Sequence, residues 1–356
     1  MVDKLEEARK IIDEVDEKMA ELFTKRMKAV EMIFEHKKKF GLPILEQKRE
    51  DALIEKNATL VQDETIKGYY IDYLKDVMAI SKAYQYRMQN GLKVAYSGVP
   101  GAFAYIAAGR IFRNGNRISH RDFKEAYQAV VNGECDVAVL PIENSYAGEV
   151  GQTIDLLFSG PLFINGIYEL QIQQNLLGVP GAIVDDIKKV TSHQQALGQC
   201  HDYIKLRNLE VEEATNTAVA AKMVAEKADK TLGAIASVET ADIYGLKVLE
   251  ANINKSAENT TRFAVFSKVK ADTEAFSNSV LMFTVKNEAG ALAKTLNIIG
   301  SHGFNMRSLR SRPMKELIWN YYFYVELEGN INSQEGKDML RALNIFCDKL
   351  KVVGIY

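Results

Sequence analysis

Cysteine is scarce in this 356-residue sequence, and no long apolar run is present. The three cysteines (Cys135, Cys200 and Cys347) are scattered and odd in number, which is typical of a reducing compartment. The absence of a CxxC pair argues against a zinc ribbon or a thioredoxin-type site. No apolar stretch reaches the ~20 residues of a membrane span, and the charged N-terminus lacks the apolar core of a signal peptide. We therefore expect a cytoplasmic protein without a membrane partner.

An excess of charge of either sign is also missing. Lys and Arg number 45 against 47 Asp and Glu, so the formal net charge is −2 and no global basic field favours nucleic acid as a partner. With 47% hydrophobic residues the chain can bury sizeable cores. A soft prior of roughly 150 residues per domain predicts two or three domains.

Common signatures of nucleotide, nucleophilic and metal-dependent chemistry are absent too. The glycine-rich turn at 98–104 is not followed by the Gly-Lys-Ser/Thr of a Walker loop, and there is no GxSxG nucleophile elbow. His193, Cys200 and His201 lie close together in the sequence but lack any zinc-finger spacing. We therefore predict neither a metal site nor a cofactor.

Glycine and proline are rare in residues 1–90, which hold two of the 23 glycines and one of the six prolines. Apolar residues recur there at helical spacing and predict an all-α region with helices over about 4–39, 45–60 and 64–89. The sequence FGLP at 40–43 ends the first helix. Because this helix has no neighbour of similar length, we expect it to pack against a partner chain.

The remaining sequence separates into two further regions. From 92 to 268, short β-rich runs alternate with helical stretches, which predicts an α/β fold with a mainly parallel sheet and helices on both faces. From 278 to 356 the order is β-α-β-β-α-β, which is that of an α+β ferredoxin-like domain. The polar stretch 270–278 is the predicted linker.

Several polar residues fall on the apolar faces of the predicted helices. On the first helix, Arg26 and Lys37 lie within the apolar stripe and Arg9 lies at its margin. The other two helices place five polar residues similarly: Glu46, Arg49, Glu50, Ser81 and Gln85. Taken singly, each is better explained by snorkelling or by mutual pairing. As a set, cations that converge on a helical core predict a buried anion, and carboxylates match the fork of a guanidinium.

This set of residues resembles that of the all-helical chorismate mutases, over residues 3–89. The resemblance implies an intertwined dimer, in which Arg26 and the partner's Arg9 hold the two carboxylates of chorismate. Lys37 and Gln85 would hydrogen-bond its ether oxygen. The remaining substrate contacts are implied for Glu46 (where Asp is more usual), Arg49, Glu50 and Ser81. The rearrangement to prephenate is pericyclic, so holding the reactive conformer and stabilising the developing negative charge are sufficient.

The α/β region carries polar strings that offer hydroxyls, amides and helix N-termini, which suit a dianionic organic acid. Each string alone is explained by a helix cap or a turn. In order, they resemble the motifs of prephenate dehydratase across 93–267: GVPGA at 98–102, PIENS at 141–145, SH at 192–193, QAL at 195–197, QC at 199–200 and TRF at 261–263. The resemblance implies a two-lobed fold, like that of periplasmic binding proteins, with the site in the cleft.

The same resemblance assigns roles in the cleft. Thr261 would be the key hydroxyl near the departing C4–OH, and Arg262 would bind a carboxylate. The cleft lining would include Asn144, Ser192, Gln199 and Thr217. Because threonine is a weak acid, we interpret Thr261 as a hydrogen-bond donor, with either Glu143 or His193 supplying the proton. Departures from the family pattern bear on the geometry of this cleft: Ala104 for Ser, Gln194 for Pro, and the string at 170–175.

Near the start of the last region, Gly290 permits close backbone approach at a helix N-terminus, with a simple turn as the alternative. This region resembles the ACT domain of prephenate dehydratases, which binds phenylalanine between paired domains. The resemblance implies an effector site made of Gly290, Ala291, Leu292, Asn305, Ser311 and Arg312. Arg310 stands where Glu is usual, which reverses a charge in that motif.

We therefore predict a bifunctional enzyme of phenylalanine biosynthesis, acting as a homodimer or higher homo-oligomer. It would rearrange chorismate to prephenate, convert prephenate to phenylpyruvate, and be inhibited by L-phenylalanine. One alternative is a chorismate mutase whose dehydratase cleft is inactive or turned to arogenate. Another is a non-catalytic amino-acid sensor, which leaves Arg9, Arg26 and Lys37 unexplained.

Overall fold

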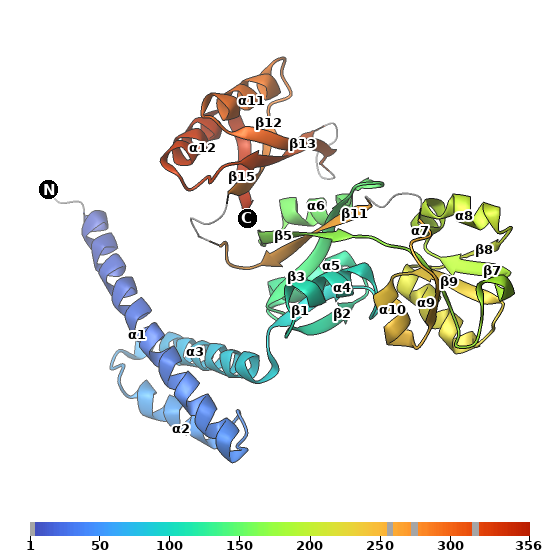
Figure 1. Ribbon diagram of the computed structural model, residues 1–356. Helices are drawn as coiled ribbons and strands as arrows, with labels where there is room; N and C mark the ends of the chain where they lie inside the picture. Colours follow the sequence, from blue (N-terminus) through green and yellow to red (C-terminus); the bar gives the residue numbers. More distant parts are fainter. Residues whose placement is uncertain (1–3, 255–258, 272–276, 315–319) are drawn as a thin grey trace. The chain divides into compact units, whose positions relative to one another are not determined.

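The computed structural model describes residues 4–254, 259–271, 277–314 and 320–356. It divides into two compact units, Met1–Leu92 and Lys93–Tyr356. The first unit is helical, and the second combines β-sheets with helices (Figure 1). Within the described residues, no helix is both long enough and apolar enough to cross a membrane.

The first unit consists of α1 (Lys4–Phe40), α2 (Gln47–Ala58) and α3 (Glu64–Asn90), within two residues of the predicted bounds. Gly41, at a φ of 65°, ends α1 in a conformation that favours glycine, and Asp63 caps α3 by accepting a 2.8 Å hydrogen bond from Thr65 N. The C-terminal half of α1 contacts α3 and buries Val30 and Phe34. Its N-terminal half exposes an apolar stripe: Leu5, Ile12, Val15, Met19, Leu22 and Phe23.

The first lobe of the second unit contains an α/β layer built on strands that order β5-β11-β3-β1-β2, with β4 beside β3. Its strands are β1 (Lys93–Ser97), β2 (Asn116–His120), β3 (Val137–Asn144), β4 (Gly148–Glu149), β5 (Phe163–Gln171) and β11 (Thr260–Ser267). Its helices are α4 (Phe103–Ile111), α5 (Phe123–Asn132) and α6 (Gly151–Ser159). This lobe supplies one wall of the cleft described below.

The second lobe is inserted between β5 and β11, and its sheet has the order β10-β6-β9-β7-β8. Its strands are β6 (Asn175–Gly178), β7 (Lys189–Ser192), β8 (Glu210–Glu213), β9 (Leu232–Ala236) and β10 (Lys247–Glu250). Its helices are α7 (Gln194–Gln199), α8 (His201–Leu206), α9 (Thr217–Lys227) and α10 (Val238–Tyr244), and a 3-10 turn covers Val184–Asp186. The two-lobed α/β architecture confirms the predicted fold class.

The prediction of a mainly parallel sheet was wrong in part. Strand β1 is parallel to both β2 and β3, but β11 is antiparallel to both β3 and β5. In the second lobe, β6 is antiparallel to β9 and β10. The reason is the insertion, because β5 leads out of the first lobe and β11 returns into it in the opposite direction.

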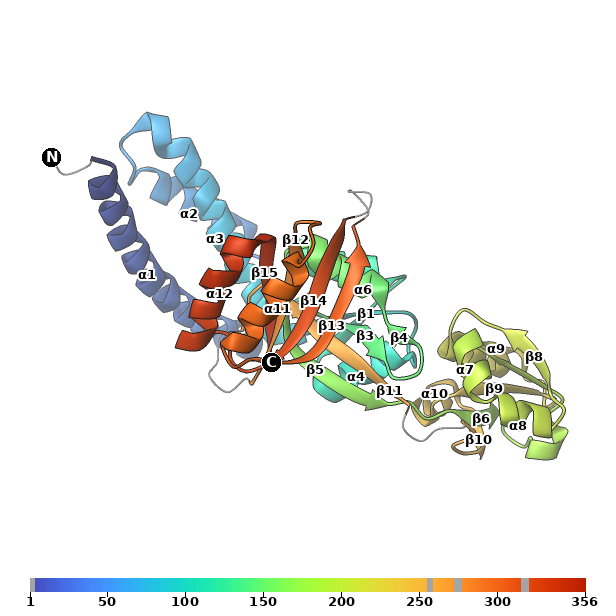
Figure 2. The same ribbon diagram turned by 90° about the horizontal axis from the view of Figure 1, so that it is seen from above.

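The C-terminal region has the predicted order β-α-β-β-α-β. It comprises β12 (Asn278–Val285), α11 (Ala291–Ser301), β13 (Asn305–Pro313), β14 (Tyr321–Glu328), α12 (Gln334–Phe346) and β15 (Cys347–Ile355). Helices α11 and α12 contact each other and cover one face of the sheet β13-β14-β12-β15 (Figure 2). The other face shares a core with the first lobe, where Met282 and Tyr324 cluster with Ile154 and Leu157 of α6. Burial of this apolar face stabilises the contact between the two domains.

Candidate active sites

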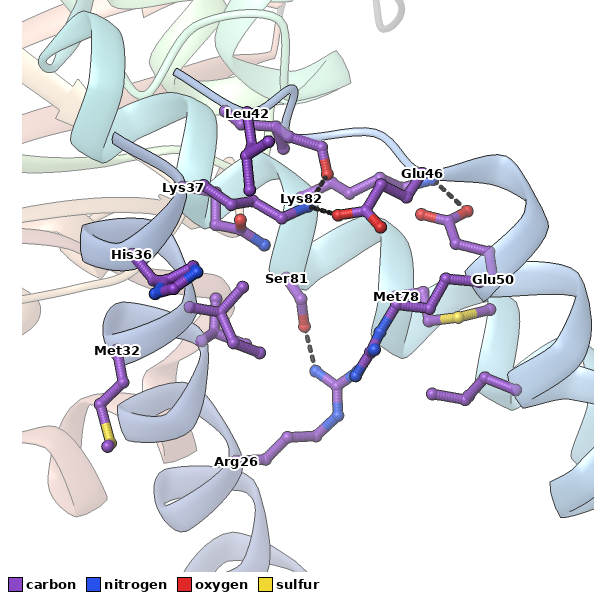
Figure 3. Close-up of a pocket in the computed structure, with 16 residues that line it drawn as sticks. Arg26, Met32, His36, Lys37, Leu42, Glu46, Glu50, Met78, Ser81 and Lys82 are labelled. Atoms are coloured by element: carbon purple, nitrogen blue, oxygen red, sulfur yellow. Dashed lines mark hydrogen bonds and ion pairs between the residues drawn. The ribbon is translucent and has the colours of Figure 1, made fainter. Parts of the chain in front are cut away.

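A cavity of about 450 Å³ lies among the three helices of the first unit. Figure 3 shows polar side chains from all three helices pointing into it. Lys37 Nζ pairs with Glu46 Oε1 at 2.7 Å and donates to the Ile44 carbonyl at 2.8 Å. Lys82 Nζ lies 2.8 Å from Glu50 Oε2. The hydrogen bond from Lys37, followed by its charge, lowers the pKa of the Glu46 carboxyl.

On the opposite wall, Arg26 donates to the hydroxyl of Ser81, which in turn donates to the Val77 carbonyl at 2.8 Å. Burial lowers the pKa of the Arg26 guanidinium. The Gln85 Oε1 atom is buried and accepts no hydrogen bond within the described structure. An unsatisfied buried oxygen beside a cavity is a candidate contact for a ligand.

The charges on this lining do not balance. It carries Arg26, Lys37, Arg49 and Lys82 against only Glu46 and Glu50, which leaves a formal charge of +2. A dianion would neutralise that excess, and two guanidinium groups can each form a fork with a carboxylate. The composition of the walls therefore fits a dicarboxylate.

Seven of the eight residues predicted for this site line the cavity: Arg26, Lys37, Glu46, Arg49, Glu50, Ser81 and Gln85. Arg9 does not. It lies on the exposed half of α1, 17 residues before Arg26, which at a rise of 1.5 Å per residue is about 26 Å along the axis. Arg9 therefore cannot reach the cavity of its own chain. Lys82 was missed, although helical spacing places it one turn after Met78 on the same face.

A second cavity, of about 300 Å³, lies in the cleft between the two lobes of the α/β region. Thr261 Oγ1 accepts a hydrogen bond from Asn144 Nδ2 at 2.9 Å, which leaves its hydroxyl hydrogen for an acceptor in the cleft. Asn144 is itself fixed, because its Oδ1 accepts from the backbone N–H groups of Tyr146 and Ala147 at 3.0 and 2.9 Å. The turn after β3 thus orients the amide that orients Thr261.

Much of the cleft lining from the second lobe lies at the starts of α7 and α9. His193 precedes α7, and its Nδ1 accepts from Gln195 N at 3.3 Å. Asn216 caps α9 by accepting from Val219 N at 2.8 Å, and Thr217 begins that helix. Gln199 Oε1 accepts a 2.9 Å hydrogen bond from Asn259, a residue that also accepts from Asn144 and so links both lobes.

Comparisons with known proteins connect these cavities to two activities. Residues 8–86 match the family model for chorismate mutase type II, 94–271 that for prephenate dehydratase, and 279–344 that for the ACT domain. The bifunctional chorismate mutase/prephenate dehydratase of Aquifex aeolicus is 31% identical over 366 aligned residues, covering 100% of this chain and 98% of its own. The enzyme of the same name from Neisseria gonorrhoeae is 30% identical, covering 98% and 95%.

The chain belongs to the family of bifunctional chorismate mutase/prephenate dehydratases. It is an enzyme with both of these domains followed by an ACT domain. The helical cavity lies within the chorismate mutase match, and the interlobe cleft lies within the prephenate dehydratase match.

Relatives of the second unit extend the comparison. The prephenate dehydratase of Arthrobacter aurescens, solved with L-Phe, is 26% identical with a TM-score of 0.69, covering 74% of this chain and 89% of its own. A structure described as a novel type of quorum quenching acylase is 30% identical with a TM-score of 0.69, covering 74% and 97%. Arogenate dehydratase 2 of Petunia hybrida is 34% identical over 74% of this chain and 71% of its own. The same scaffold therefore carries other named activities.

Two residues expected in the dehydratase cleft lie elsewhere. Ser192 is fully buried, and its Oγ donates to the Ile235 carbonyl at 2.6 Å. The Arg262 guanidinium does not line the cleft but pairs with Glu143 and Glu326, each at 3.0 Å. Asn144, Gln199, Thr217 and Thr261 do line it. The lining residues that sequence reasoning did not assign to the site are Ala102, Phe103, Phe123, Ile172, Gln174, Gln195, Ala196, Thr215 and Asn216.

Of the two proton donors considered, only His193 lines the cleft. Glu143 points toward Arg262 and Arg310. Although burial raises the pKa of the Glu143 carboxyl, hydrogen bonds from the two arginines outweigh it and lower the pKa overall. A carboxylate that is turned away from the cleft and held ionised is a poor source of protons.

The six residues expected in the ACT effector site do not lie together within one chain. Gly290 precedes α11 at a φ of 81°. It follows the C-terminal end of β12, which β14 separates from Pro313 on β13. Asn305 lies at the other end of β13, where its amide donates to Glu328 at 2.9 Å. Arg312 is directed to the first lobe, where its Nε donates to Asp155 at 2.8 Å. Ala291 and Leu292 follow Gly290, and Ser311 is exposed on β13.

Proposed function

We propose that chorismate is rearranged to prephenate in a helical site completed by a second copy of the chain. The exposed apolar stripe of α1 supports a homodimer, since its burial would be favourable. Arg9 lies beside that stripe, too far from its own cavity to contribute there. In an antiparallel pairing of α1 helices, Arg9 of the second copy would reach the cavity and raise its positive charge. Higher oligomers remain compatible with this arrangement.

In this site Arg26 and Arg9 of the second copy would hold the two carboxylates. Lys37 and Gln85 would stabilise the negative charge that develops on the ether oxygen as the C–O bond breaks. The remaining contacts, from Glu46, Arg49, Glu50 and Ser81, would hold the compact conformer in which the new C–C bond can form. The +2 lining is the observation that carries this assignment.

For the interlobe cleft, we propose that prephenate loses its ring hydroxyl as water and its ring carboxylate as CO2. The electron pair of the breaking C–CO2 bond enters the ring, which becomes aromatic, and the product is phenylpyruvate. Thr261 would donate a hydrogen bond to the departing oxygen. His193, as the imidazolium, would supply the proton that turns the departing hydroxyl into water, and would be left as the neutral ring.

The choice of prephenate over arogenate rests on the cleft walls. Arogenate differs by an ammonium group, which a site would match with a carboxylate. The described lining of the cleft contains no Asp or Glu, but it offers neutral donors at the start of α9, where Thr217 and the helix dipole favour an anion. Asn144 and Gln199 complete the polar wall.

We also propose that L-phenylalanine inhibits the dehydratase by binding at the start of α11 between paired ACT domains, near Gly290. The relative from Arthrobacter aurescens was solved with that ligand. The open backbone at Gly290, where an added Cβ would meet nothing within 4 Å, supports close approach of a ligand. The domain bounds 1–90, 92–268 and 278–356 and a cytoplasmic location remain predictions.

The decisive experiment supplies chorismate and prephenate separately to the purified chain and quantifies prephenate and phenylpyruvate by chromatography, with and without phenylalanine. We expect phenylpyruvate from both substrates, and less of it with phenylalanine. Arogenate serves as the matched third substrate, which we expect to be converted more slowly than prephenate. Prephenate that accumulates from chorismate and is not consumed would refute the dehydratase assignment. Ligand binding without any product would favour a sensor.

A further inference from the structure

Strands β3 and β11 present paired residues to two opposite sides. Asn144 lies opposite Thr261, and the adjacent Glu143 lies opposite Arg262. Because successive side chains of a strand alternate between faces, the first pair points into the cleft and the second points toward the ACT domain. The backbone that holds the proposed hydrogen-bond donor is therefore the same backbone that carries this second pair.

The second pair joins a closed ionic cluster with the ACT domain. Arg262 forms a fork with the two carboxylate oxygens of Glu326, at 3.0 Å each, and also binds Glu143 at 3.0 Å. Arg310 of β13 donates to the other oxygen of Glu143. Tyr324 and Tyr356 donate hydroxyl hydrogen bonds to Glu326 at 2.7 and 3.1 Å.

The cluster is largely shielded from solvent. The side chain of Glu326 is 2% exposed, and those of Arg262 and Arg310 are 17% and 18% exposed. Two guanidinium groups face the carboxylates of Glu143 and Glu326, and the 66% exposed Glu169 lies 3.7 Å from Arg262 Nε at the rim of the cluster. Removing one member would leave a buried charge uncompensated. A carboxylate at position 310 would leave four carboxylates around the single guanidinium of Arg262.

We propose that Arg310 is a positioning residue for dehydration, which holds Glu143 and through it the β3–β11 pair that aligns Asn144 and Thr261. This inference deepens the proposed function and rests on it. Arg310 touches neither the cleft nor the substrate, so its effect reaches Thr261 only through the strands. The kcat of the dehydratase then depends on how the ACT sheet packs against the first lobe.

The test compares Arg310→Gln and Arg310→Glu with Arg307→Glu, a control on the same strand whose side chain is 48% exposed and lies 3.7 Å from Glu328. With prephenate as substrate, we expect kcat to fall about tenfold or more in Arg310→Glu and less in Arg310→Gln, with KM within about twofold, because a misplaced donor costs rate rather than binding. The control should retain wild-type kinetics. Chorismate mutase activity of each variant reports that the protein sample is intact.

Two further measurements separate positioning from a merely structural role. The double variant Glu143→Arg/Arg310→Glu restores the charge balance, so its kcat should recover most of the loss. Backbone hydrogen exchange in Arg310→Gln should rise at 143–145 and 260–262, next to the cleft. If kcat stays within about twofold of wild type while exchange rises only in β13, the proposal is wrong. Wild-type protein that never dehydrates prephenate would instead refute the proposed function.

Discussion

The helical cavity and the interlobe cleft differ in the charge of their walls, although each is proposed to hold an organic dianion. The first carries four cations and two carboxylates. The described lining of the second carries no Asp, Glu, Lys or Arg, and relies on amides, hydroxyls, one histidine and helix starts. Near the cleft, Arg262 is already neutralised by protein carboxylates.

This difference follows the chemistry proposed for each site. A pericyclic rearrangement moves no proton, so the protein can lower its barrier mainly by placing fixed positive charge near the ether oxygen. Dehydration with loss of CO2 requires a carboxylate that leaves as a neutral molecule. Strong cationic pairing would stabilise that carboxylate in the ground state and slow its departure. Neutral dipoles can orient the substrate without this penalty.

The sharpest test of the comparison is removal of the cation proposed to face the ether oxygen. Lys37→Ala should reduce mutase kcat about 100-fold to 1,000-fold, because a preorganised charge at the transition state is lost. Dehydration of added prephenate should be unchanged. Both activities are measured on the same sample, with Lys38→Ala, an exposed neighbour on α1, as the control. Loss of both activities in a folded protein would contradict separate sites.

The reciprocal variant addresses the neutral cleft. Thr261→Ala should lower dehydratase kcat about 100-fold, since one donor to the departing oxygen is removed and Asn144 loses one of its acceptors. Mutase activity should be retained. Thr261→Ser keeps the hydroxyl and should recover much of the rate. If alanine is as active as threonine, the hydroxyl is not a donor in the transition state.

The helices and strands, and the faces on which their residues lie, were predictable where they depend only on spacing within a short stretch of sequence. The periods of 3.6 and 2 located the three helices and the ferredoxin-like order, and helical spacing gathered Arg26, Lys37 and Ser81 on one cavity. For β3 and β11, the alternation of side chains between the two faces of a strand was not used to predict their orientation. Two successive residues of a strand cannot both face a cleft, so the placement of Thr261 there already turns Arg262 away.

Other features depend on contacts that no local pattern encodes. The antiparallel return of β11 joins residues more than one hundred positions apart in sequence, as in the hydrogen bond between Asn144 and Thr261. The burial of Ser192 beneath Ile235 depends on how β7 and β9 pair. The pairing of Arg310 with Glu143 depends on how the C-terminal domain packs against the first lobe. Motif resemblance located such residues without giving the direction of their side chains.

Feedback inhibition should also affect the two activities differently. We expect phenylalanine to inhibit dehydration of prephenate, and Gly290→Val to raise the inhibitory concentration about tenfold, because a branched side chain at positive φ distorts the start of α11. The mutase reaction should respond less than the dehydratase in both proteins. Gly303→Val, at a φ of 80° after the same helix, is the control for strain alone. Unchanged inhibition would remove Gly290 from the effector site.

The smallest expected effect concerns Lys351, a half-buried cation whose partners are backbone carbonyls of the protein rather than a ligand. Lys351 on β15 donates to the carbonyls of Leu157, at 2.7 Å, and Gly160, at the end of α6, and burial lowers its pKa to about 8. Its ordinary pKa is 10.5. Between these values the unfolded chain binds more protons than the folded one, so stability rises with pH.

From pH 7 to pH 9, Lys351 should therefore raise the free energy of unfolding of the second unit by less than about 1 kcal/mol, once solvent screening is discounted. Above pH 9 the buried Cys135 thiol, whose pKa burial raises to about 11, opposes this trend because the unfolded thiol ionises first. Denaturant titrations of wild type, Lys351→Met and the exposed control Lys337→Met would isolate the slope. If the free energy of unfolding of Lys351→Met still rises with pH as in wild type, another group causes the pH dependence. The contrast with Lys37, which faces an open cavity, would then no longer hold.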